Sequence, residues 1–195
     1  TATFTPGRDA ARKEASKLNV PRIGVRFRLP ASMNQVEYFG RGPAENYLDR
    51  NAGSMIGLYK STAEELYFPY VRPQENGHHT NTRWVSLSTG KKGLLIQADN
   101  TIGFNALRNS IEDFDDEEAT GLPRQWSNFT PEQVANHDEA AAKNVLRRQH
   151  HINDITPRNF VEVCVDLKQQ GVAGYDSWGS RPEPAYTLPA NREYN

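Results

Sequence analysis

A loop near the C-terminus holds the residues best suited to bind a ligand. It reads GVAGYDSWGSRPEP over residues 171–184, and Trp178 lies at its centre. Glycine and proline restrict the backbone on both sides, so we predict a rigid aromatic platform there. The alternative is a tryptophan that caps the edge of the hydrophobic core, as buried tryptophans usually do. The residues expected to support the platform are Asp176, Ser177, Gly179 and Arg181.

A second group of polar residues follows a predicted strand in the run GRGPAENYLDR at 40–50. Such a run is either a surface turn with weak ion pairs or a polar network that docks one domain on another. We favour docking, and we add two residues of the later run QENG to the set. The candidate docking residues are Arg41, Glu45, Asn46, Tyr47, Asp49, Arg50, Glu75 and Asn76.

Other residue types that often do chemistry are poorly placed for it. His78 and His79 are adjacent, as are His150 and His151, and neighbouring residues of a strand point to opposite faces. We therefore predict no metal site. Cys164 is the only cysteine, which excludes an intrachain disulfide, and we interpret it as a small buried residue.

Composition narrows the classes of partner. The 195 residues carry a net charge of −1 with a pI near 6.5, so no basic surface for nucleic acid is expected. No apolar run reaches the roughly 20 residues that span a bilayer. The compartment, cytoplasmic or periplasmic, is left open.

Alternating apolar and polar residues indicate an all-β chain. Residues 1–19 are interpreted as a linker or mobile lead-in, and Thr130 to Arg148 as a helical insertion. Residues 54–70 show no clean period, and Asn76-Gly77 has the composition of a tight hairpin turn. The predicted strands cover 22–29, 36–39, 83–88, 94–98, 102–107, 160–167 and 185–188.

Three ordered motifs carry a family resemblance. They are YFGRGPAENYLDR at 38–50, YVRPQENGHHTNTRW at 70–84 and GVAGYDSWGSRPEPAYTL at 171–188. Together they resemble the C-terminal, or small-chain, domain of family 2 glycoside hydrolases of the β-galactosidase type, here assigned to residues 20–195. The resemblance implies a large antiparallel β-sandwich, a supersandwich like that of galactose mutarotase, with short helical insertions.

The family domain usually begins further toward the N-terminus, so we expect a truncated sandwich. Loss of leading strands would expose a sheet edge and apolar surface, and the chain would then self-associate.

The resemblance also implies a division of labour. In that family a separate (β/α)₈ barrel of about 250 residues carries two glutamates that hydrolyse β-galactosides with retention. We therefore assign no catalytic residue to this chain, do not interpret Glu75 and Asp176 as a catalytic pair, and expect the chain to be inactive alone. The implied partners are the barrel domain or large chain, a galactoside, and further copies in an oligomer of the full enzyme.

By the same resemblance Trp178 stacks on the sugar at the mouth of the barrel. We expect no cofactor in this chain, and any Mg²⁺ or Na⁺ site would belong to the barrel. Three other functions stay open: a self-contained carbohydrate-binding module, a pure packing and oligomerisation element, and an aldose epimerase with a positioned acid and base.

Overall fold

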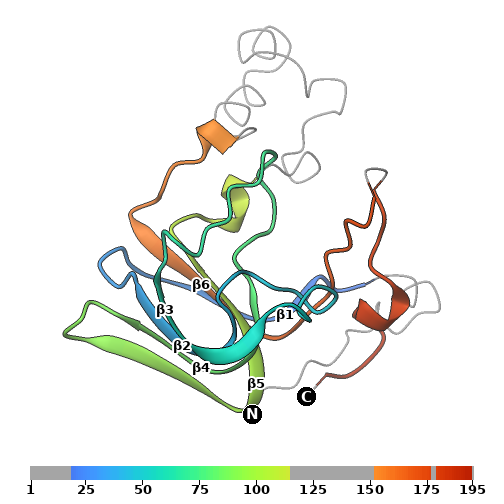
Figure 1. Ribbon diagram of the computed structural model, residues 1–195, viewed down its shortest axis with the longest axis horizontal. Helices are drawn as coiled ribbons and strands as arrows, with labels where there is room; N and C mark the ends of the chain where they lie inside the picture. The colour runs from blue at the N-terminus through green and yellow to red at the C-terminus, as the bar shows by residue number, and fades with distance from the viewer. Residues whose placement is uncertain (1–18, 115–151, 177–178, 195) are drawn as a thin grey trace, which may run out of the picture.

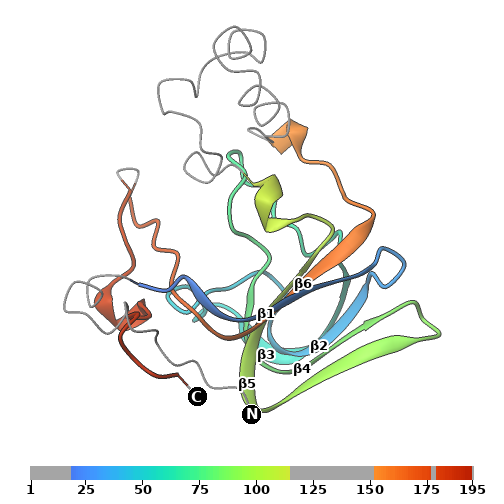
Figure 2. The ribbon, with the colours of Figure 1, turned by 180° about the vertical axis from the view of Figure 1, so that it is seen from behind.

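The computed structural model describes residues 19–114, 152–176 and 179–194. Within these ranges six antiparallel strands form one sheet in the order β1-β6-β5-β4-β2-β3 (Figures 1 and 2). The described helices are three 3₁₀ turns, and the predicted all-β antiparallel class is confirmed. The elements are β1 Arg22–Pro30, β2 Gln35–Gly42, β3 Met55–Thr62, β4 His79–Ser88, β5 Gly93–Leu107, η2 Ile111–Asp113, η4 Ile152–Asp154, β6 Phe160–Gln169 and η5 Pro184–Tyr186.

Two of the strand predictions are wrong. Residues 94–98 and 102–107 belong to one strand, β5, because the residues around Asp99-Asn100 are accommodated as a bulge opposite β4 rather than as a turn. Residues 185–188 form no strand, since Pro184 starts the turn η5. The predicted helix at 130–148 and nearly all of the lead-in at 1–19 lie outside the described residues.

The hydrophobic core lies on one face of the sheet. Alternate residues of β2, β4, β5 and β6 point into it, among them Tyr38, Val85, Phe104 and Val163, which are almost inaccessible to solvent. Each fully buried side chain of this size contributes about 1.5–3 kcal/mol to folding. Figures 1 and 2 show the loop between β3 and β4 beside η2, and Tyr67 and Phe114 stack at this point.

On β6 the residues that alternate with the core valines are buried as well. Glu162 and Asp166 are each about 3% exposed or less, and both form salt bridges with arginines of β1. Arg22 reaches Asp166 at 2.6 Å, and Arg26 and Arg28 reach Glu162 at 2.9 and 3.0 Å. The alternating arginines of β1 are therefore cross-strand partners of buried acids, and two of them, Arg26 and Arg28, also stay exposed to solvent.

The opposite face of β2, β3 and β4 exposes apolar side chains. Phe39 pairs with Leu58 on one side and with Trp84 on the other, and Leu95 of β5 lies on the same face. Leu58 is 57% exposed and Leu95 is 61% exposed, while Phe39 and Trp84 are half-buried. Within the described residues β3 pairs only with β2, so its other edge is unpaired.

This outer face gives a first testable prediction. The isolated chain should bind a hydrophobic dye and should self-associate as its concentration rises, because an apolar face beside a free strand edge favours association. Leu58→Lys should weaken both effects. The matched control is Val71→Lys, which changes an exposed loop valine away from β3. A monodisperse monomer without dye binding would contradict the prediction.

Candidate functional site

The three sequence motifs meet at one cleft of about 600 Å³, which we call the three-motif cleft. This volume falls within the usual range of ligand pockets. Polar and aromatic side chains line it together with backbone of the last motif. The lining residues are Pro21, Arg22, Tyr47, Arg50, Tyr70, Gln74, Glu75, Gln169, Gln170, Gly171, Val172, Ala173, Gly174 and Pro182.

Two residues of the first motif hold the second motif in place. Glu45 accepts hydrogen bonds from the Gly77 backbone N–H at 2.6 Å, from Arg50 at 2.7 Å and from the Tyr70 hydroxyl. Asn46 is buried, and its Oδ1 accepts from the backbone N–H of Thr80 at 3.0 Å and from the Thr80 hydroxyl. Most of these bonds are partly buried, and only the bond from Arg50 is exposed, so together they fix how the two motifs meet.

The same motif also reaches the third one. The Asp49 carboxylate accepts from the backbone N–H groups of Val172 and Ala173 at 3.1 and 2.8 Å. The Arg41 side chain instead donates hydrogen bonds to Asn81 Oδ1 and to the backbone carbonyls of Asn51 and Ser54. The first motif is therefore the part of the chain that cross-links the cleft.

Behind the cleft lies a buried polar network centred on Asn105 of β5. Its Oδ1 accepts from Arg22 at 2.7 Å and lies 2.8 Å from His78 Nδ1. Its Nδ2 donates to Glu75 at 3.0 Å and to the Asn76 carbonyl at 2.7 Å. All the hydrogen-bonding capacity of this amide is used, and such satisfied networks fix a unique arrangement.

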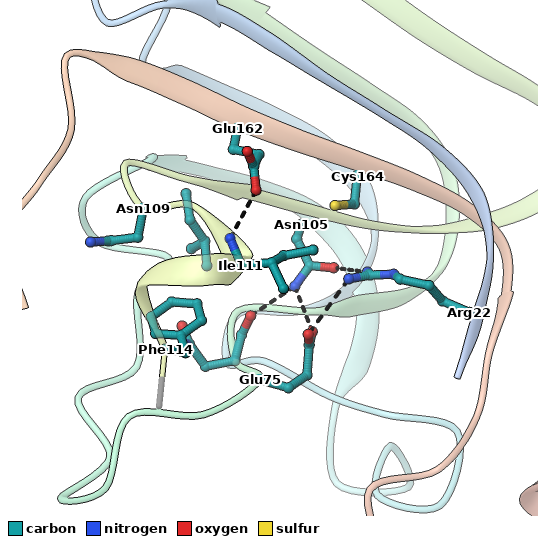
Figure 3. Close-up of a pocket in the computed structure, with 10 residues that line it drawn as sticks. Arg22, Glu75, Asn105, Asn109, Ile111, Phe114, Glu162 and Cys164 are labelled. Carbon is teal, nitrogen blue, oxygen red and sulfur yellow. Dashed lines mark hydrogen bonds and ion pairs between the residues drawn. The ribbon is translucent and has the colours of Figure 1, made fainter. Parts of the chain in front are cut away.

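Figure 3 shows the Arg22, Glu75 and Asn105 part of this network at a small second pocket of about 10 Å³. Arg22 and Glu75 line both the pocket and the cleft. Cys164 also lines the pocket and is buried, as predicted, and burial raises the pKa of its thiol to about 11. The pocket holds nothing larger than a water molecule, so the cleft is the better site for a ligand.

Burial changes the ionisation of groups around the network. It raises the pKa of Glu75, although the Arg22 guanidinium opposes the change. It lowers the pKa of His78 to about 3 and also lowers the pKa of His79. The two histidines lie on opposite sides, since His78 contacts Asn105 while His79 stacks on Phe104.

Tyr47 stands out among the cleft residues. Its ring is 1% exposed, stacks on His78 and is covered by the Arg50 guanidinium. Among the described residues its hydroxyl makes no well-formed hydrogen bond, although the backbone of His78 lies close to it. A buried hydroxyl without a partner is costly, so it is a candidate contact for a ligand.

The predicted platform is described only in part. Trp178 and Ser177 lie outside the described residues. Asp176 is exposed and its Oδ1 accepts from the Ser180 N–H at 3.4 Å, Gly179 has a φ of 83°, and Arg181 is exposed. The roles given to these residues stay predictions, as do the docking roles of the first two motifs.

Two further findings concern the described ranges alone. No group of three or more His, Cys, Asp or Glu side chains there is arranged to hold a metal ion. No helix among those residues has both the length and the apolarity needed to cross a bilayer.

The network behind the cleft was missed at the level of sequence. Arg22, Asn105 and Asp166 were each placed on predicted strands without a role. One signal was available, because Glu162 and Asp166 interrupt the otherwise apolar strand NFVEVCVDL. Acids are rarely buried without a partner, so arginines on another strand could have been sought.

The described residues thus form an antiparallel all-β domain with a polar cleft built from three distant motifs. The chain matches the β-galactosidase small chain over residues 2–195 and therefore belongs to that family.

Individual relatives agree with this assignment. A β-galactosidase of Priestia megaterium is 32% identical over 176 residues, which is 90% of this chain and 14% of the relative. A β-galactosidase of an Arthrobacter species is 39% identical over 54% of the chain and 11% of the relative, and one of Lactobacillus delbrueckii subsp. bulgaricus is 30% identical over 89% and 14%. The chain spans about a seventh of the length of such relatives.

Proposed function

We propose that this chain is the non-catalytic small-chain domain of a retaining β-galactosidase. In this function the catalytic glutamates act in a barrel domain, and the present domain completes the sugar site with Trp178 and supports assembly of the enzyme. The supporting observation is the three-motif cleft, whose rim is the backbone segment that leads to Trp178. Family membership and the names of the relatives agree with this function.

The physical contribution of Trp178 is a contact that leaves hydroxyl groups free. One face of a galactose ring carries several C–H groups, and an indole that covers them removes apolar area from water. The hydroxyls still hydrogen-bond to other groups. The interaction is the same in the bound ground state and in the transition state, so it acts on binding more than on the chemical step.

A reconstitution experiment tests the proposal. The chain alone should not hydrolyse a chromogenic galactoside, and activity should appear when the matching barrel fragment is added. In the assembled enzyme Trp178→Ala should raise KM about 3- to 10-fold with little change in kcat, since one aromatic contact contributes about 0.5–1.5 kcal/mol. Trp84→Ala, on the outer face, is the matched control and should leave KM unchanged.

Three results would redirect the proposal. Hydrolysis by the chain alone would move the catalytic residues into this domain. A Trp178→Ala enzyme with reduced stability but normal KM would favour a packing and oligomerisation element. No activity even after mixing would leave the accessory role unsupported.

The cleft itself favours a second candidate, a self-contained carbohydrate-binding module. The observations that support it are the volume of the cleft and the Tyr47 hydroxyl, which makes no well-formed hydrogen bond within the described residues. Galactose titrated into the chain alone should then bind measurably, and Tyr47→Phe should weaken binding without weakening the fold. Absence of binding up to high millimolar galactose would reject this candidate.

A further inference from the structure

The Asp49 side chain lies against the backbone where the Trp178 loop begins. Its Oδ1 accepts from the Val172 N–H at 3.1 Å and its Oδ2 from the Ala173 N–H at 2.8 Å. The Tyr175 hydroxyl lies 3.5 Å from the same Oδ2. Consecutive N–H groups that converge on one carboxylate form an anion nest, and bonds to a charged acceptor are the stronger kind.

Gly171 shows how closely the carboxylate is fitted. A Cβ added at this buried glycine would lie 2.4 Å from Asp49 Oδ2, 2.5 Å from its Cγ and 3.0 Å from its Cβ. All three of its nearest neighbours are thus atoms of Asp49. The φ of Gly171 is not in the left-handed region, so the need for glycine comes from the carboxylate and not from the backbone conformation.

Ala173 adds a second sign of constraint. Its φ is 56°, a left-handed value that residues with a side chain seldom adopt. The N–H of this same residue makes the shorter bond to Asp49. The carboxylate therefore holds the segment in a conformation that the sequence alone would not favour.

The described residues on either side of the loop tip bind each other. The Tyr175 N–H donates to Ser180 Oγ at 3.1 Å, and the Ser180 N–H donates to Asp176 Oδ1 at 3.4 Å. These two bonds join the two arms of the loop at its neck. Because the neck follows directly from residues 171–174, the backbone direction set at Asp49 continues into the described arms of the loop.

We propose that Asp49 is a positioning residue for this loop and, through it, for the contact of Trp178 with sugar. The second half of this inference rests on the proposed function. The first half concerns the chain alone. The carboxylate of Asp49 is occupied within this domain, and its predicted docking role stays a prediction.

The first test uses the chain alone. Asp49→Ala should speed hydrogen exchange of the Val172 and Ala173 amides at least tenfold and should shift the indole N–H signal of Trp178 in ¹H–¹⁵N spectra. Asp49→Asn keeps one acceptor oxygen and should give a smaller change at the same signals. Glu37→Gln is the matched control, because Glu37 pairs with Lys60 on another face of the domain. Unchanged amide and indole signals in Asp49→Ala would overturn the proposal.

A double-mutant cycle tests the same contact through stability. Gly171→Ala should lower the melting temperature in the wild-type background, where the new Cβ meets the carboxylate. In an Asp49→Ala background the same change should cost much less, since only the Cβ of residue 49 remains nearby. Equal costs in both backgrounds would show that Gly171 is required for another reason and would overturn the close fit.

The assembled enzyme separates this proposal from the proposed function. Asp49→Asn should raise KM for the galactoside by no more than Trp178→Ala does, with kcat nearly unchanged. The double variant should have a KM close to that of Trp178→Ala alone. If Trp178→Ala leaves KM unchanged, the sugar role fails while the exchange and indole data still decide the role of Asp49. If Trp178→Ala raises KM but Asp49→Ala does not, the proposed link from Asp49 to sugar binding is wrong.

Discussion

Arg22→Ala is expected to lower the free energy of unfolding by about 3–5 kcal/mol, the usual cost of removing one partner of a buried ion pair. Arg22 binds Asp166 through Nε at 3.1 Å and Nη2 at 2.6 Å, and the side chain of Asp166 is only 2% exposed. Asn105 and Glu75 would lose the same partner. Without the guanidinium, a carboxylate is left buried and unpaired.

Urea unfolding monitored by circular dichroism measures this loss. Arg83→Ala removes an exposed arginine of β4 and serves as the matched control, with an expected change below about 0.5 kcal/mol. Adding Asp166→Asn to Arg22→Ala should restore part of the stability, since the uncompensated charge is then removed. If Arg22→Ala fails to fold, Arg22→Lys keeps the charge and should give a smaller, measurable loss. A loss below 1 kcal/mol for Arg22→Ala would show that the pair contributes little.

Acid is expected to destabilise the domain through His78. Burial lowers the pKa of His78 to about 3, whereas an unfolded histidine titrates near 6.5. At pH values between these two pKa values, His78 binds a proton in the unfolded state and not in the folded state. The contribution of His78 to stability is therefore complete above pH 6.5 and is lost as the pH falls toward 3, by up to about 1.4 kcal/mol per pH unit.

The surroundings of His78 leave no site for that proton. Its ring packs on Tyr47 and against Gly103, and Nδ1 faces Asn105 with Asp166 at 3.9 Å and Arg22 nearby.

Other groups act on the same pH range. The pKa of His79 is lowered as well, and burial raises the pKa values of Glu75 and Asp166, which opposes acid unfolding. The effect of His78 is therefore best isolated as a difference between proteins.

The measurement compares unfolding free energies of the wild type and His78→Gln from pH 7 to pH 4. The advantage of the wild type should shrink steadily as the pH falls. Gln74→Ala changes a cleft residue that does not titrate. The difference between its unfolding free energy and that of the wild type should therefore stay constant with pH. Direct titration of the His78 ring by NMR should show no protonation above pH 4. A ring that titrates near 6 would refute the argument.

The sequence pattern predicted the strands whose two faces differ. Residues 22–29 and 160–167 alternate cleanly, and β1 and β6 lie there. β3 was missed because it is an edge strand with exposed apolar residues, such as Met55, Ile56 and Leu58, so burial imposes no period. Gly77 has the positive φ expected of an Asn-Gly pair, yet no hairpin forms. Asn76 instead uses its side chain to hold Phe68 and Gln74 within a longer loop.

The sequence predicted residues of the candidate site but not which of them contact one another. The motif residues were singled out because glycine, proline and polar side chains are dense there. Their mutual contacts were not foreseen, since Asp49 and Val172 are 123 residues apart and Arg22 and Asp166 are 144 apart. Local periodicity carries no information about such pairs. The hub Asn105 lies in a run with no unusual composition.

These long separations set the order in which the domain is made. When the first motif has just been synthesised, the bonding partners of Asp49 lie more than a hundred residues further along the chain. Closing loops of this length is slow because chain entropy is lost before any contact forms. The cleft can therefore appear only after residue 173 is available, and a nascent or C-terminally shortened chain holds two complete motifs but no cleft. Formation of the cleft thus reports that synthesis has passed the third motif.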